Sequence, residues 1–182
     1  MKFTSKQFVL KNGEKLSIRE GKKSDASDLI KYLNQVAGES DFLTFTEGEF
    51  KMTKKGEEAF VEEAHKADNE IFLVAEIGKE IVGVLNVNAN SKKRMKHIGT
   101  FGVSLKKAHW GKGIGALFIQ TMLDWAKSNG VTRKMNLSVM ANNKRAMKLY
   151  KKFGFKKEGL LKRDALINGK FYDAYLMGLL ID

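Results

Sequence analysis

Three glycines stand within five residues at a junction between an expected strand and an expected helix. The segment reads VSLKKAHWGKGIGALFIQ, residues 103–120, and its glycines are Gly111, Gly113 and Gly115. The start of a helix offers unpaired N–H groups and a partial positive charge, and a backbone without side chains lets a phosphate group approach them. The spacing therefore favours a phosphate-binding turn, whereas a tight turn with close strand–helix packing would explain one or two of these glycines.

This junction matches neither of the two common glycine-rich nucleotide motifs. The Walker pattern needs four residues between its first glycine and Gly-Lys-Ser/Thr, and the dinucleotide fingerprint needs G-x-G-x-x-G, whereas the spacing here is G-x-G-x-G. Lys106, Lys107 and Lys112 add cations around the turn. The sequence therefore indicates a phosphate site that belongs to neither class.

The helices and strands expected on either side of this turn indicate one α/β domain over residues 1–182. The chain is 43% hydrophobic and 30% charged and has neither an internal repeat nor a Pro-rich linker, which is typical of a single globular core. Hydrophobic periodicity predicts the order β-α-α-β-β-β-α-β-α-β-β. The expected strands cover 15–20, 70–77, 81–90, 97–105 and 134–141 and a closing hairpin that turns at Asn168-Gly169; the expected helices begin near Ser24, Glu57, Gly113 and Asn142.

Composition excludes several kinds of site. The chain has no cysteine, so it has no disulfide, thiolate metal site or cysteine nucleophile. No histidine–carboxylate spacing resembles a metal site, so we expect no metal. No apolar run approaches the roughly 18 residues that a membrane span needs, and the N-terminal apolar stretch is too short for a signal peptide. We therefore expect a cytoplasmic protein that does not associate with membranes.

Charge is distributed unevenly along the chain. The net charge is +12, but residues 39–63 contain eight acids and three lysines, so this segment carries −5 and the remainder +17. An acidic segment on a basic body is either solvated surface or a face toward a cationic substrate. The basic remainder contains no recognised nucleic-acid module and no patch interleaved with aromatic residues, so we expect no nucleic-acid partner.

Two motifs and the closing hairpin resemble the GNAT superfamily of acetyl-CoA-dependent N-acetyltransferases. The first is the glycine-rich junction. The second is V-x-x-x-N-x-x-A-x-x-L-Y-x-K-x-G-F, which is complete here from Val139 to Phe155. The pattern is similar to bacterial subfamilies of ribosomal-protein and polyamine N-acetyltransferases. The resemblance implies a GNAT-type mixed, mostly antiparallel central sheet flanked by helices.

The resemblance also implies a role for each matching residue. Acetyl-CoA would be the co-substrate, and the backbone of the strand at Val103, Ser104 and Leu105 would pair with its pantetheine arm. Asn143 would contact it near the sulfur, and Tyr150 would be the general acid. The pyrophosphate would lie on the backbone amides of the glycine-rich turn, at Gly111, Lys112, Gly113, Ile114, Gly115 and Ala116.

Two positions depart from the family pattern. Trp110 stands where the family has Gln or Arg, which removes one side-chain donor to phosphate and leaves the backbone cradle. Thr100 stands where many relatives carry a glutamate general base, and a threonine cannot act as a base near neutral pH. We therefore expect Glu39, or a neighbouring carboxylate such as Asp41, to position or deprotonate a cationic amine.

The expected reaction is direct transfer of an acetyl group to a primary amine, such as a protein N-terminus, a polyamine or another small cationic amine. An α-amine, with a pKa of about 7.7–8.0, is already roughly one-tenth neutral at pH 7 and suits a site without a strand glutamate. The alternative is a catalytically idle acyl-CoA-binding or sensor module, which Thr100 leaves open. A homodimer contact through Phe42 and Phe45 also stays open.

Overall fold

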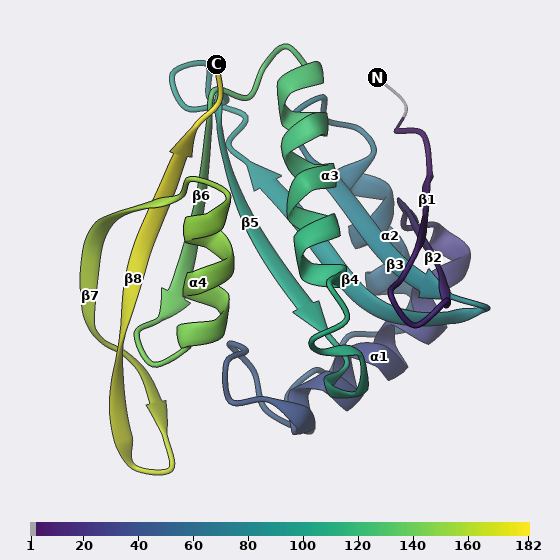
Figure 1. The fold of residues 1–182 in the computed structure, drawn as a ribbon, viewed down its shortest axis with the longest axis horizontal. Helices are drawn as coiled ribbons and strands as arrows, with labels where there is room; N and C mark the ends of the chain where they lie inside the picture. The colour runs from purple at the N-terminus through teal and green to yellow at the C-terminus, as the bar shows by residue number, and fades with distance from the viewer. Residues whose placement is uncertain (1–2) are drawn as a thin grey trace.

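A computed structural model, which describes residues 3–182, contains one eight-stranded sheet (Figure 1). The strand order is β1-β2-β3-β4-β5-β6-β8-β7, and every pairing is antiparallel except the one between β5 and β6. The elements are β1 Lys6–Val9, β2 Lys15–Glu20, α1 Ala26–Glu39, α2 Lys54–Ala64, β3 Ile71–Ile77, β4 Glu80–Ala89, β5 Ile98–Leu105, α3 Ile114–Ser128, β6 Lys134–Met140, α4 Lys144–Lys152, β7 Lys156–Ile167 and β8 Lys170–Leu180. The expected mixed, mostly antiparallel α/β architecture is thus confirmed.

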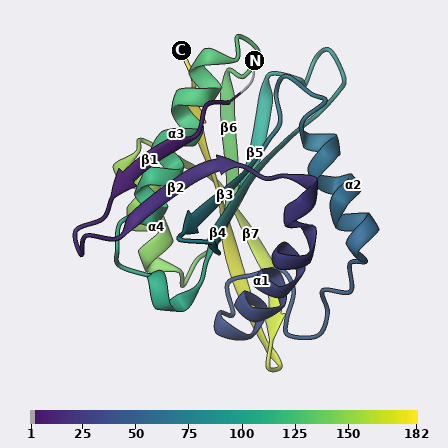
Figure 2. The same cartoon turned by 90° about the vertical axis from the view of Figure 1, so that its right-hand side faces the viewer.

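Helices cover both faces of the sheet. Figure 2 shows α3 and α4 on one side and α1 and α2 on the other. On the first side, Phe118 and Met122 of α3 are fully buried in the larger core cluster. On the second side, Leu29 and Tyr32 of α1 pack in a smaller cluster with residues of β3 and β4. The two apolar layers hold the sheet in place from both sides, and the ends of its strands are left to carry the residues of a site.

The element order agrees with the prediction except at the N-terminus. The structure has an additional strand, β1, which pairs with β2 through four residues. Helix α1 begins at Ala26 after a short 3₁₀ turn, so Ser24 is not its N-cap. Helix α2 begins at Lys54, before the expected Glu57, because the Thr53 hydroxyl accepts the Gly56 amide at 3.1 Å and caps the helix.

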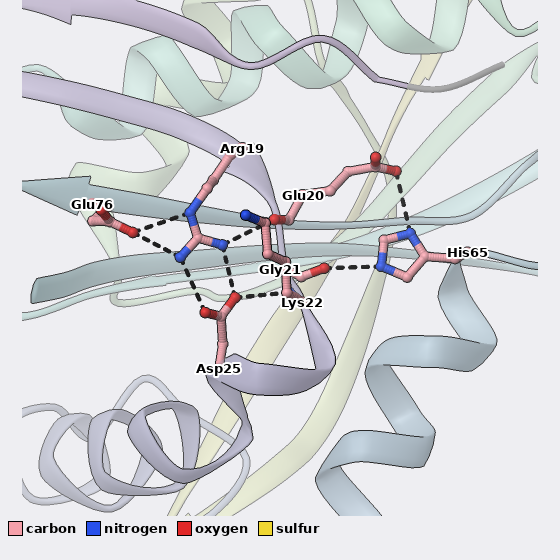
Figure 3. A network of polar contacts seen from close by, with 7 residues as sticks. All are labelled: Arg19, Glu20, Gly21, Lys22, Asp25, His65 and Glu76. Atoms are coloured by element: carbon pink, nitrogen blue, oxygen red, sulfur yellow. Dashed lines mark hydrogen bonds and ion pairs between the residues drawn. The ribbon is translucent and has the colours of Figure 1, made fainter. Parts of the chain in front are cut away.

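A polar network ties β2 and β3 to the start of α1 and the end of α2 on the second face (Figure 3). Arg19 donates to Asp25 at 2.7 Å and to Glu76 at 2.7 Å. His65, at the end of α2, lies 2.8 Å from the Gly21 carbonyl oxygen and 3.4 Å from the Glu20 carboxylate. Burial raises the pKa of Asp25, but the hydrogen bonds from Arg19 and from the Lys22 amide outweigh it and hold the pKa below its ordinary value.

Candidate functional site

The two parallel strands β5 and β6 pair only at their beginnings. Their register joins Ile98 to Lys134, Gly99 to Met135 and Thr100 to Asn136, and it ends there. Figure 1 shows the strands diverging beyond this point. We call the region bounded by residues 101–105 of β5 and 137–140 of β6 the fork, and the Thr100–Asn136 pair its apex.

Backbone groups of β5 face the fork at alternate residues. The Lys106 amide donates to the Val82 carbonyl of β4 at 3.0 Å. Because an antiparallel strand alternates its hydrogen-bonding side, Val103 and Leu105 direct their N–H and C=O groups away from β4, into the fork. The Leu105 carbonyl accepts the Trp110 indole N–H at 2.9 Å, which leaves Val103 as the predicted residue whose backbone is free to pair with an extended ligand.

Ser104 is oriented differently from its two neighbours. The same alternation directs its backbone toward β4, where it is the register partner of Val84. Its hydroxyl lies 2.9 Å from that of Tyr32 on α1. Ser104 therefore joins the strand to the helix, and its polar groups lie outside the fork.

The glycines of the junction serve two different purposes. Gly111 and Gly113 have φ of +82° and +88°, and a Cβ built on either would have no atom within 4 Å. These two positions need glycine for their backbone conformation and leave open space above it. Gly115 instead packs, because its Cβ would lie 3.2 Å from Leu149 Cδ2 of α4.

Unpaired amides line this open space. Within the part of the chain that the structure describes, the amides of residues 111–115 donate no hydrogen bond. The Ala116 amide donates to the Gly113 carbonyl at 3.0 Å, so the cradle ends one residue before the predicted limit. Three of these free N–H groups belong to the turn and two to the first residues of the 15-residue helix α3, an arrangement that suits an anion.

Side chains around the cradle are held by other parts of the protein. Lys112 Nζ lies 2.9 Å from Glu14 Oε2 and 3.4 Å from His109 Nδ1. The Trp110 ring lies 5.2 Å from the guanidinium carbon of Arg145. Burial, with Lys112 nearby, lowers the pKa of His109. The free donors at this turn are therefore backbone amides, while the side chains of Trp110 and Lys112 are engaged with other groups.

Tyr150 lies at the apex of the fork, on the α3–α4 side. It is 8% exposed and packs edge-on against Phe101, the first β5 residue beyond the paired region, at 5.7 Å between ring centroids. Burial raises its pKa to about 12, so the phenol keeps its proton throughout the physiological range. The hydroxyl makes no hydrogen bond with residues 3–182, and it is not among the fully buried unpaired polar atoms of that range, so it keeps some exposure.

Asn143 caps helix α4. Its Oδ1 accepts the Ala146 amide at 3.1 Å. Only the Nδ2 group is left for the contact near the sulfur that the resemblance implies.

Glu39 lies at the open mouth of the fork. Its Oε2 accepts the Lys107 amide at 2.7 Å and its Oε1 accepts from Gln35 Nε2 at 2.8 Å. Lys107 follows the end of β5, and Leu105 is already roughly 16 Å along the strand from Thr100 at about 3.3 Å per residue. Glu39 therefore anchors the turn that leads into the cradle.

A pocket of about 220 Å³ opens at this mouth. Its lining comes from the end of α1 and the residues after it, from Trp110 beside the glycine-rich turn, from Asn142 and from the β7–β8 hairpin. Its lining combines carboxylates with aromatic rings and an amide: Glu39, Asp41, Phe42, Trp110, Tyr172 and Asn142. Asn142 and Tyr172 were not among the predicted site residues. For Tyr172 the reason is that only the folded hairpin brings it to this pocket. Carboxylates beside aromatic faces suit a cation.

Residues 3–182 contain neither a membrane-crossing helix nor a cluster of metal-binding side chains. No helix in that range is both long and apolar enough to cross a membrane. No group of three or more His, Cys, Asp or Glu residues in that range is placed to hold a metal ion.

Comparison with known proteins identifies the family. The family model for acetyltransferases of the GNAT family matches residues 38–155. A GNAT-family acetyltransferase from Streptococcus pneumoniae is 38% identical, with a TM-score of 0.89 over 91% of this chain and 99% of its own. The L-amino acid N-acetyltransferase AaaT of Escherichia coli K12 is 32% identical over 58% of this chain and 65% of its own length.

A more distant structure shares the fold. The yncA acetyltransferase from Salmonella typhimurium, solved with its cofactor acetyl-CoA, is 19% identical with a TM-score of 0.80 over 92% of this chain and 94% of its own. The fold and the family match agree, and the chain belongs to the GNAT family of acetyltransferases.

Proposed function

We propose that this protein transfers the acetyl group of acetyl-CoA directly to a primary amine of a cationic acceptor, with Tyr150 as the general acid. The observation that carries the proposal is the Tyr150 hydroxyl, which has no hydrogen-bond partner among residues 3–182; its side chain is 8% exposed and packs beside Phe101 at the apex of the fork. The amides of residues 111–115 would hold the pyrophosphate at the other end, and the Val103 backbone would pair with the arm between them.

Tyr150 would supply a proton where the reaction needs one. Attack by the amine breaks the carbon–sulfur bond, and the departing thiolate has an intrinsic pKa of about 8.5. The raised pKa of Tyr150, about 12, keeps the phenol protonated before the reaction. It also means that the proton moves as the bond to sulfur breaks and not before. Such positioned acids contribute about 10²–10⁴-fold to a rate.

The pocket at the mouth of the fork supports a cationic acceptor. Asp41 and Glu39 place two carboxylates beside the rings of Phe42 and Tyr172. They belong to the segment that carries −5 on a body of +17, so a cation is drawn to this region in preference to the rest of the surface. The acceptor classes are a protein N-terminus, a polyamine or another small cationic amine; the name of AaaT adds free amino acids to the panel worth testing.

A thiol-release assay with acetyl-CoA tests the proposal. The panel contains spermidine, an aminoglycoside, free amino acids and a peptide with a free N-terminus, and it compares the wild type with Tyr150→Phe. We expect turnover of one class and a fall in kcat of about 10²–10⁴-fold in the variant, with the Kd for acetyl-CoA unchanged. Binding of acetyl-CoA without turnover of any amine would instead support an idle acyl-CoA-binding module.

A further inference from the structure

A β-bulge in β7 places a carboxylate beside the apex of the fork. The β7–β8 register joins Lys157 to Met177 and Gly159 to Leu176, so Glu158 is the extra residue between them. Bulges of this kind change the direction of one side chain and are frequent beside active sites. Here the Glu158 side chain leaves its own strand and lies over the backbone of β8.

Gly178 on β8 makes room for this carboxylate. A Cβ built on Gly178 would lie 2.6 Å from the Glu158 carboxyl carbon. The neighbouring β8 residues Met177 and Leu179 pack into the α3–α4 core, so Gly178 and the carboxylate above it lie on the opposite face of the sheet. Glu158 thus occupies the place that a side chain at position 178 would fill.

The carboxylate continues a row of polar side chains that crosses the apex. Gly178 is the register partner of Asn136, Asn136 that of Thr100, and Thr100 that of Asn88. Register partners direct their side chains to the same face. Thr100, which stands where relatives carry a glutamate, is therefore followed across the sheet by an amide and then by the carboxylate of Glu158.

Asn136 supplies an independent observation. Its Oδ1 is the one buried side-chain nitrogen or oxygen, among the residues that the structure describes, that lacks a hydrogen-bond partner. A buried acceptor without a donor is costly unless a ligand supplies one. An ammonium group carries three donors, so it is the kind of ligand that would satisfy Asn136 Oδ1.

We infer that Glu158 is the general base of the reaction, in place of the glutamate that Thr100 lacks, and that Asn136 holds the amine beside it. This inference rests on the proposed function. The acceptor ammonium gives one proton to Glu158 and becomes a neutral amine. Its nitrogen attacks the thioester carbon, the carbon–nitrogen bond forms and the carbon–sulfur bond breaks.

Each remaining proton of the reaction has a donor and an acceptor. Tyr150 gives its proton to the sulfur and takes the second amine proton in return, so it ends as it began. Glu158 releases its proton to solvent. Two cations accompany the carboxylate: Lys134 Nζ lies 2.8 Å from Glu158 Oε2, and Lys156 is the other register partner of Gly178. Glu39 is left to anchor the cradle.

Three variants separate this role from a structural one. Glu158→Gln keeps the shape and removes the base, Glu158→Asp keeps a carboxylate, and Lys134→Met breaks the same ion pair while leaving the carboxylate in place. With acetyl-CoA and the panel amine that the wild type acetylates fastest, we expect Glu158→Gln to lower kcat at pH 7 by about 10²–10³-fold. Glu158→Asp should recover part of that loss, and Lys134→Met should stay within about threefold of the wild type.

The pH dependence gives the decisive readout. The loss in Glu158→Gln should shrink as the pH rises toward 10, because the amine then loses its proton without help. The Kd for acetyl-CoA should be the same in all four proteins, which also shows that they fold. A loss that is independent of pH, an equal loss in Lys134→Met, or full activity of Glu158→Gln would overturn the inference alone. Absence of turnover by the wild type on every amine would overturn the proposed function, and this inference with it.

Discussion

The two sides of the fork differ in the kind of chemical group that they offer. The side that we propose for acetyl-CoA is one continuous stretch, residues 103–115, and it offers backbone groups: the Val103 peptide and the five amides of residues 111–115. The side that we propose for the acceptor is assembled from the side chains of distant segments, from Asp41 after α1 to Tyr172 on β8. A backbone cradle tolerates little variation, whereas a side-chain pocket can change its ligand one residue at a time. The same donor can therefore serve many acceptors.

The largest effect on donor affinity is expected at the cradle. Gly113→Val places a β-branched residue at φ +88°, which is strained, and extends it into the open space over the amides. We expect the Kd for acetyl-CoA to rise by about 10–100-fold, as measured by calorimetry. Gly115→Ala is the matched control, since its methyl group meets Leu149. If Gly115→Ala weakened acetyl-CoA binding equally, the division between cradle and packing glycines would be wrong.

A smaller effect is expected on the acceptor side. Asp41→Asn removes one carboxylate from the pocket, so the KM for a cationic acceptor should rise by about three- to tenfold at low salt, and by less at high salt. The Kd for acetyl-CoA should not change. Asp68→Asn, an exposed acid outside the pocket, is the control. Equal KM values in Asp41→Asn and the wild type would mean that the acceptor binds elsewhere.

The smallest effect on activity is expected far from both sides, in the network of Figure 3. The pKa of Asp25 is lowered in the folded protein, so its contribution is present above the unfolded pKa of about 3.9 and is lost as the pH falls through the folded pKa. Arg19→Met should cost about 1–3 kcal/mol at pH 7 and flatten this acid dependence in urea titrations. Both KM values should match those of the wild type; a changed KM would show that the network reaches the site.

Local sequence predicted the glycine-rich junction and the last hairpin turn well because the determinants of a turn are local. Gly111 and Gly113 are needed by the conformation of their own backbone, and Asn168-Gly169 turns the last hairpin with φ of +49° and +76°, as expected. The strand β1 was missed since four residues with alternating burial give too short a signal. The role expected of Glu39 rested on its charge and its place in the sequence, and neither reveals that its carboxylate binds the Lys107 amide.

The features around Glu158 were beyond sequence reasoning for a different reason. A bulge is a mismatch between two strands, so one strand alone does not contain it. The available signal was Gly178, a glycine within the apolar run LMGLL, where a strand glycine often marks a close approach by another group. The glycine indicates the position that another group approaches, but it does not identify the residue to which that group belongs.

Trp110 has a consequence for the width of the fork. Its indole is tied to the last residue of β5 at 2.9 Å and stacks against Arg145 of α4, the helix that follows β6. The indole thus links the end of β5 to the helix that follows β6, and we expect this link to limit how far the two arms of the fork move apart, giving a preorganised slot. A preorganised slot of this kind spares acetyl-CoA the entropic cost of ordering the slot walls. Trp110 stands where the family has a side-chain donor to phosphate, and it can therefore favour binding by keeping the slot rigid.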